Sequence, residues 1–255
     1  DYIVADKNLI PESSQVNYSE KPIYLPHHYQ AQDNELPIDE AAPNRTELGL
    51  PENGFVFCAL SNSYKITPAE FDLWMRLLQA VDGSVLWLLQ GNTLVLKNLM
   101  FEAAKRSVDP ARLVFATHTD HSQYLARFQR ADLYLDTFIY NAGATASNAL
   151  WAGLPVLTKR GHGYTARMAA SLLSSIELPE LITDSEQAYE ALAIDLATNP
   201  VRMAAVKAKL VANRRTTPLF NTEMFTRHLE EGYQQAYDRY SEGKAPDVIE
   251  VTTHV

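Results

Sequence analysis

Strand-length apolar runs alternate with amphipathic stretches between residues 54 and 158. Five such runs are apolar almost throughout: "GFVFCALS", "SVLWLLQ", "RLVFAT", "DLYLDT" and "LPVLT". Each is followed by a segment with apolar residues at helical spacing, as in the stretch that Pro68 opens and that carries Phe71, Trp74 and Leu78. Strands that are apolar on both faces and are separated by helices are typical of a parallel sheet covered on both sides. The pattern therefore predicts an α/β fold with a doubly wound, Rossmann-like parallel sheet.

The remaining helices are expected from the same spacing and from terminal signals. The helix that ends at Lys105 and Arg106 places cations at its C-terminus, where the helix dipole favours them. The expected helical segments are residues 93–107, 121–129, 165–175, 184–198, 200–214 and 222–241.

The first 53 residues follow a different pattern. "DYIVAD" is typical of a short buried strand, whereas residues 7–53 contain six prolines, many polar residues and only brief strand-like pieces such as "PIYLP". A segment of this length without regular elements predicts a connection between two lobes.

Composition narrows the class of protein. The chain is 46% hydrophobic and 21% charged, as in an ordinary globular protein, and its formal net charge of −9 argues against a nucleic-acid or anionic-membrane partner. Cys58, the single cysteine, lies inside an apolar run, so we expect a buried, inert thiol and no intramolecular disulfide. The apolar runs are far shorter than the roughly 20 residues of a membrane span, and the N-terminus lacks a signal-peptide pattern. These features predict a cytoplasmic protein.

A turn of small residues precedes the helix expected after the fourth run. "YNAGATASNALWAGLPVL" places Gly143, Ala144 and Thr145 where a strand passes into a helix. The first amides of a helix have no partners inside it and attract anions, so this turn predicts a phosphate site, with Asn148 on the same face. The alternative is that Thr145 or Ser147 simply caps the helix.

A lysine follows the first apolar run of this region. Lys65, in "SNSYKIT", is expected at the carboxyl edge of the sheet, where ligands of such folds bind. About 4 Å from a phosphate, an ammonium group would contribute roughly 4 kcal/mol at an effective dielectric constant near 20. The alternative is an ordinary solvated lysine, although a second anion-binding feature at a neighbouring strand end favours the site.

The segment "THTDHSQYLAR" adds aromatic and basic groups. Tyr124 and Arg127 share a helix face, where the ring could stack on a base or serve plain packing. His118, Asp120 and His121 do not form a recognisable set of metal ligands, so no metal is expected.

Several stretches closely resemble the catalytic region of O-linked N-acetylglucosamine transferases, glycosyltransferase family 41. They include "FVFCALSNSYKITPAEFDLWMRLL", "ADLYLDTFIYNAGATASNALWAGLPVLT" and "TPLFNTEMF", and the resemblance covers nearly the whole chain. It implies an inverting, metal-independent enzyme of the two-lobed GT-B fold. Residues 1–46 would be the end of the first catalytic lobe and the inter-lobe linker, 47–241 the nucleotide-sugar-binding lobe and 242–255 a C-terminal tail. The rest of the first lobe and tetratricopeptide repeats would precede residue 1.

The resemblance also implies roles for individual residues. Lys65 would contact the donor diphosphate and stabilise the leaving group. The binding set would comprise Asn62, Thr119, His121, Tyr124, Arg127, Gly143, Ala144, Thr145 and Asn148.

Several of these residues depart from the family pattern. Gly143, Ala144 and Thr145 stand where the family has His-Thr-Thr, Asn148 replaces a ribose-binding aspartate, and Tyr124 replaces a histidine. The resemblance thus implies a bacterial-type relative, divergent at the donor site, that transfers N-acetylglucosamine from UDP-GlcNAc to Ser or Thr of proteins without a further cofactor. The alternatives are another donor such as GDP-fucose, or a degenerate binding or scaffold module. The 255 residues alone are expected to bind nucleotide weakly and to transfer little or no sugar.

Overall fold

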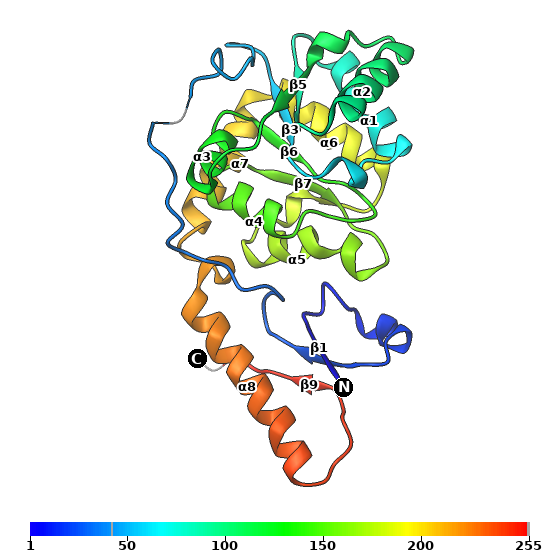
Figure 1. The fold of residues 1–255 in the computed structure, drawn as a ribbon. Helices are drawn as coiled ribbons and strands as arrows, with labels where there is room; N and C mark the ends of the chain where they lie inside the picture. The colour runs from blue at the N-terminus through cyan, green and yellow to red at the C-terminus, as the bar shows by residue number, and fades with distance from the viewer. Residues whose placement is uncertain (42, 254–255) are drawn as a thin grey trace.

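A parallel six-stranded sheet forms the centre of the larger unit (Figure 1). The computed structural model of this protein describes residues 1–41 and 43–253. The strand order is β5-β4-β3-β6-β7-β8, and every pairing is parallel. The strands are β3 (Val56–Ala59), β4 (Val85–Leu89), β5 (Leu113–Ala116), β6 (Leu133–Leu135), β7 (Val156–Lys159) and β8 (Ile182–Thr183). The predicted α/β parallel sheet is confirmed, and β8 is an additional edge strand that the sequence pattern did not indicate.

Helices connect these strands and cover both faces of the sheet. Because the chain winds outward from β3 in one direction and from β6 in the other, right-handed crossovers place the helices after β3 and β4 on one face and those after β6 and β7 on the other. The helix after β8 packs against the helix after β3. None of the helices in the described residues is both long and apolar enough to cross a membrane. The helices are α1 (Pro68–Ala80), α2 (Thr93–Lys105), α3 (His121–Phe128), α4 (Ala144–Trp151), α5 (Met168–Ser175), α6 (Glu186–Thr198), α7 (Pro200–Asn213) and α8 (Thr222–Ser241).

The core follows the periodicity of the sequence. The apolar face of α1, including Trp74 and Leu77, is buried, and so are all four residues of β3. Cys58 is buried at the centre of the sheet, as expected, and burial raises the pKa of its thiol. The helix expected at 165–175 begins with a 3-10 turn at Tyr164–Ala166 and continues as α5.

A second, smaller sheet joins both ends of the chain (Figure 1). It has the order β1-β2-β9, with β1 (Tyr2–Ala5), β2 (Lys21–Tyr24) and β9 (Ile249–Glu250) in parallel. Ile23 and Ile249 pack with Phe225 of α8, and a β-carbon at Gly232 would lie 2.6 Å from Cγ2 of Ile23, so α8 approaches the sheet closely. Thus β9 lies within the expected tail, and α8 covers the small sheet.

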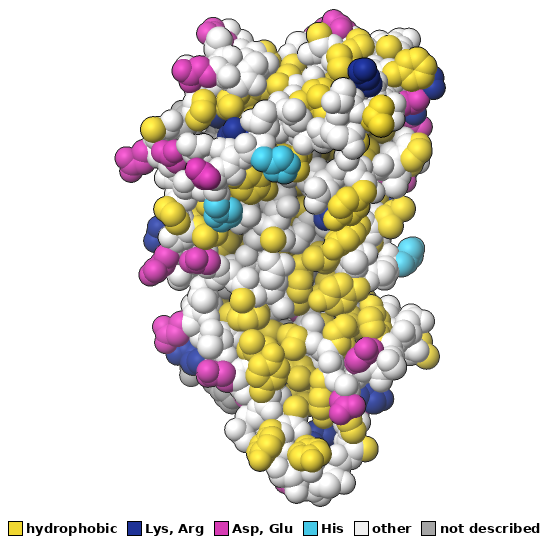
Figure 2. All heavy atoms as spheres, in the orientation of Figure 1, with side chains coloured by type: hydrophobic (Ala, Val, Ile, Leu, Met, Phe, Trp, Pro, Cys, Tyr) yellow, Lys and Arg dark blue, Asp and Glu magenta, His cyan; other side chains and the backbone are white. Residues whose placement is uncertain are grey.

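The two units meet through polar and apolar contacts. The buried carboxylate of Asp6, just after β1, accepts a hydrogen bond from Oγ of Ser171 in α5 at 2.6 Å. Arg167, just before α5, donates through Nε to the Asn8 carbonyl at 2.5 Å. Figure 2 shows a band of hydrophobic side chains that runs across this junction on one face of the molecule. The small unit is therefore held firmly against the end of the larger one at which α5 begins.

Candidate active site

The site lies between β3 and β6, where the direction in which the chain adds strands to the sheet reverses. β3 and β6 are neighbours, and the chain leaves them in opposite directions, so the loops at their carboxyl ends part and leave room for a ligand. Residues 60–67 follow β3, and residues 136–143 follow β6 and lead into α4. Lys65 belongs to the first loop and the small-residue turn to the second.

The Lys65 side chain reaches across to the second loop. Its Nζ donates to the Asn141 carbonyl at 3.0 Å and lies 4.0 Å from the ring centroid of Tyr140. Partial burial lowers the pKa of Lys65, and the nearby Asp136 carboxylate opposes that shift. Within the described residues no carboxylate lies within ion-pair distance of this ammonium group. Lys65 is therefore a half-buried cation held by neutral groups, not the freely solvated lysine considered above.

Asp136 holds the second loop from within. Its buried carboxylate accepts from the amides of Thr137 at 2.9 Å and Ala142 at 2.7 Å, and from the Thr158 hydroxyl at 2.7 Å. Burial raises the pKa of Asp136 to about 7, because these three hydrogen bonds and Lys65 only partly offset the loss of solvation. Because Asp136 binds both ends of the loop, it fixes the backbone that enters α4.

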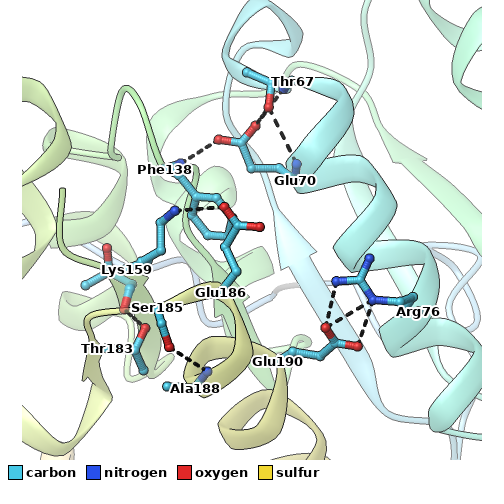
Figure 3. A network of polar contacts seen from close by, with 11 residues as sticks. Thr67, Glu70, Arg76, Phe138, Lys159, Thr183, Ser185, Glu186, Ala188 and Glu190 are labelled. Atoms are coloured by element: carbon cyan, nitrogen blue, oxygen red, sulfur yellow. Dashed lines mark hydrogen bonds and ion pairs between the residues drawn. The ribbon is translucent and has the colours of Figure 1, made fainter.

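A second buried carboxylate ties the same loop to α1. Glu70 closes a capping box with Thr67, and its other oxygen accepts the Phe138 amide at 2.7 Å. Figure 3 shows how the Lys159 ammonium group, paired with Glu186 at 3.0 Å, lies beside the Phe138 ring. The loop after β6 is thus braced by α1 on one side and by β7 and α6 on the other.

Removing the Glu70 carboxylate should destabilise the fold. We expect Glu70→Ala to lower the free energy of unfolding by about 3 kcal/mol, since it breaks the capping box and leaves the buried Phe138 amide without an acceptor. Glu190→Ala, which breaks the more exposed Arg76–Glu190 pair in the same view (Figure 3), should cost less than about 1 kcal/mol. Urea denaturation of both variants measures this difference, and equal losses would contradict the assigned role of Glu70.

The N-terminus of α4 is open on one side and packed on the other. In the described residues no side chain caps this helix. Ser147 donates instead to the Ala144 carbonyl at 2.9 Å, and Thr145 lines the same pocket as Tyr124. The capping alternative for Thr145 and Ser147 is therefore not what the structure contains. Ala144 is exposed and Thr145 half-buried, and Thr145 lines the pocket described below.

Gly143 is small for a packing reason. A β-carbon there would lie 2.5 Å from the terminal methyl of Met168, 3.2 Å from the Tyr29 hydroxyl and 3.3 Å from Oε1 of Gln30. The absence of a side chain at 143 thus accommodates residues from α5 and from the segment after β2, and it does not leave an empty space on that side.

A pocket of about 340 Å³ lies beside the open side of α4. It is formed by the carboxyl ends of β3 and β5 and by α3, from which Tyr124 lines it with its ring 6.1 Å from that of His121. Arg127 contributes from the same helix and donates to the Thr117 carbonyl. The lining residues are Leu60, Ser61, Asn62, Leu89, Ala116, Thr117, His118, Thr119, His121, Tyr124, Arg127 and Thr145.

The structure brings together six of the ten residues predicted from the sequence. Asn62, Thr119, His121, Tyr124, Arg127 and Thr145 line the pocket. Lys65, Gly143, Ala144 and Asn148 do not line it. Lys65 and Gly143 belong to the adjoining loop and helix start, and Asn148 is a partly exposed residue one turn into α4.

Sequence reasoning missed several neighbours. Thr117 and His118 line the pocket, although Thr117 was not considered and His118 was weighed only as a metal ligand; their place at the end of the third apolar run was the available signal. Tyr140 and Asn141 hold Lys65, but no sequence pattern pairs them with a lysine 75 residues or more away. No group of three or more His, Cys, Asp or Glu side chains suited to a metal ion occurs among residues 1–41 and 43–253.

Comparison with known proteins gives consistent matches. A family model described as "Glycosyl transferase family 41" matches residues 28–229. The chain is 32% identical over 257 residues to the probable UDP-N-acetylglucosamine–peptide N-acetylglucosaminyltransferase SEC of Arabidopsis thaliana, covering 98% of this chain and 26% of that protein. It is 31% identical over 223 residues to UDP-N-acetylglucosamine–peptide N-acetylglucosaminyltransferase of Caenorhabditis elegans, covering 88% of this chain and 19% of that protein.

A solved structure agrees with these matches. A mutant O-GlcNAc transferase of Thermobaculum terrenum superposes with a TM-score of 0.85 at 27% identity, over 96% of this chain and 46% of that one. The chain therefore spans about a quarter or less of the two curated relatives and under half of this structural relative.

Proposed function

Because this chain belongs to glycosyltransferase family 41, we propose that it forms the nucleotide-sugar-binding lobe of a protein O-glycosyltransferase. The donor is UDP-GlcNAc and the acceptor is a Ser or Thr hydroxyl of a protein. The names of the Arabidopsis and C. elegans relatives, which specify UDP-N-acetylglucosamine and a peptide, support this choice of substrates.

One observation carries the proposal. A half-buried ammonium group without a carboxylate partner in the described chain reaches toward the loop that opens α4, and the amides of Ala144 and Thr145 at that helix start have no side-chain cap. The pocket beside them contains a tyrosine, an arginine and several hydroxyl groups. Aromatic and hydrogen-bonding groups suit a nucleoside, and the helix start with Lys65 suits a diphosphate.

The proposed chemistry uses this placement. The acceptor oxygen attacks the anomeric carbon as the bond from that carbon to the diphosphate oxygen breaks, which inverts the configuration. Negative charge then grows on the departing nucleoside diphosphate, where Lys65 and the α4 amides stabilise it without requiring a metal ion. The acceptor and the base that takes its proton are supplied mainly by the first catalytic lobe.

Binding of nucleotide to the 255-residue chain tests the proposal. Isothermal titration with UDP should give weak but saturable binding, and sugar transfer by the isolated chain should be slight or absent. Binding of GDP in place of UDP would keep the nucleotide-sugar lobe and change the donor, for example to GDP-fucose. A chain that binds none of UDP, GDP or their sugars would favour a scaffold that has kept the fold and lost the donor.

A further inference from the structure

The Tyr29 hydroxyl is a buried donor without a hydrogen-bond partner in the part of the chain that the structure describes. It comes from the segment after β2, outside the six-stranded unit, yet it lies 3.2 Å from the position of a β-carbon on Gly143 at the start of α4. Among the described residues its oxygen has no hydrogen-bond partner. An isolated buried hydroxyl costs free energy in the unliganded protein, and an oxygen atom of a bound ligand would supply the missing acceptor.

The surroundings show where that partner would bind. The Asp136 carboxylate lies near enough to the Tyr29 hydroxyl to add to the rise of its pKa that burial causes. The same carboxylate opposes the lowering of the Lys65 pKa. Tyr140, whose ring lies under the Lys65 ammonium group, is also close enough to influence Tyr29. Tyr29 and Lys65 therefore approach the start of α4 and its entering loop from two different parts of the chain.

We infer that Tyr29 is a donor-site residue, whose hydroxyl hydrogen-bonds the phosphate group held at the N-terminus of α4. The inference rests on the proposed function, and it assigns to the segment after β2 a polar group that the glycine at 143 cannot supply. Gly143 leaves the room in which the Tyr29 hydroxyl and the Gln30 amide group lie. A side chain at 143 would crowd the hydroxyl of Tyr29 and force it to shift.

The chemistry of the hydroxyl suits an anion. Burial raises the pKa of Tyr29, and the Asp6 and Asp136 carboxylates raise it further, so the hydroxyl keeps its proton and remains a donor. Access requires one small movement. The terminal methyl of Met168 lies closest to Gly143, and a methionine end rotates readily, so the phosphate displaces it to reach Tyr29.

Replacing Tyr29 by phenylalanine tests the inference, because it removes only the hydroxyl. The affinity of Tyr29→Phe for UDP should fall about tenfold, as expected for a hydrogen bond to a charged group, while its affinity for uridine stays unchanged. Its melting temperature should be unchanged or higher, since a buried unpaired group is removed. Tyr164→Phe is the matched control: the ring of Tyr164 lies 5.9 Å from that of Tyr29, and its loss should leave UDP affinity unaltered.

The outcomes separate this inference from the proposed function. A Tyr29→Phe variant that binds UDP as tightly as the parent chain overturns the inference and leaves the proposed function standing. Equal losses for UDP and uridine also overturn it, because they indicate ring packing and not a phosphate contact. If the parent chain binds GDP instead, GDP and guanosine replace the two probes. A parent chain that binds neither nucleotide removes the proposed function and this inference with it.

Discussion

Replacing Lys65 by methionine is expected to weaken UDP binding about a hundredfold. A unit charge about 4 Å from a phosphate contributes roughly 4 kcal/mol at an effective dielectric constant near 20, and partial exposure of Lys65 reduces this to nearer 3 kcal/mol. The fold should not suffer, because Lys65 has no carboxylate partner in the described chain and burial already lowers its pKa. Titration of UDP into both proteins, with thermal melting alongside, separates binding from stability.

Lys159→Met is the matched control for this prediction. Lys159 also lies at the carboxyl end of a strand, β7, and its ammonium group also lies beside an aromatic ring, that of Phe138. It differs in having a carboxylate partner, Glu186, at 3.0 Å. Its replacement should therefore leave UDP affinity within about twofold of the parent chain and should lower stability slightly. If Lys159→Met loses UDP binding and Lys65→Met does not, the assignment of the phosphate site is wrong.

Much of the larger unit could be predicted because its signals are local. Apolar runs buried on both faces specify β3, β4, β5, β6 and β7, and Pro68 with the Thr67–Glu70 capping box specifies the start of α1. In the small sheet, β1 and β2 confirm the strand expected in "DYIVAD" and the strand-like piece "PIYLP". β9 was beyond reach, since it is short and its pairing with β2 joins residues more than 220 positions apart. The sequence of α8 is typical of an ordinary amphipathic helix, and no feature of it indicates which sheet the helix covers.

The site shows the same division. Position at a strand end was enough to select Lys65 and the turn before α4, because parallel strands bring their carboxyl ends to one edge. Asn62, Thr119 and His121 were implied only by the family resemblance. The packing around Gly143 could not be foreseen, since it depends on Met168 and Tyr29 from distant parts of the chain. The run of small residues suggested a bare backbone, whereas the structure shows Gly143 packed and only the following residues open.

Two buried titratable groups should give the protein an unusual dependence of stability on pH. Burial raises the pKa of Asp136 to about 7 from a usual value of 3.8 and lowers the pKa of His28 to about 4 from a usual value of 6.5. His28 lies between the carbonyls of Gln30 and Pro218, at 2.8 and 3.4 Å from its ring nitrogens, and stacks on Phe225. Both groups are therefore neutral in the folded protein at pH 5 to 6, where the unfolded chain carries both charges.

The two shifts act with opposite sign. The folded chain binds the Asp136 proton more tightly than the unfolded chain does, so this group stabilises the fold at low pH. Its contribution to the free energy of unfolding falls by about 4 kcal/mol as pH rises from about 4 to 7. The unfolded chain binds the His28 proton more tightly, so this group costs about 3 kcal/mol as pH falls from about 6.5 to 4. Between pH 4 and 6.5 the changes that the two groups cause in the free energy of unfolding therefore nearly cancel.

The difference between each variant and the parent chain should reveal the contribution of the replaced group. Asp136→Asn mimics the protonated carboxyl, so its free energy of unfolding, measured by urea denaturation at several pH values, should increase relative to that of the parent chain by about 4 kcal/mol between pH 4 and 7.5. The free energy of unfolding of His28→Gln should rise relative to that of the parent chain as pH falls from 6.5 to 4. A difference between Asp136→Asn and the parent chain that is the same at every pH would contradict the raised pKa. The carboxylate would then be ionised in the fold throughout this range, and its hydrogen bonds to Thr137, Ala142 and Thr158 would outweigh the cost of its burial.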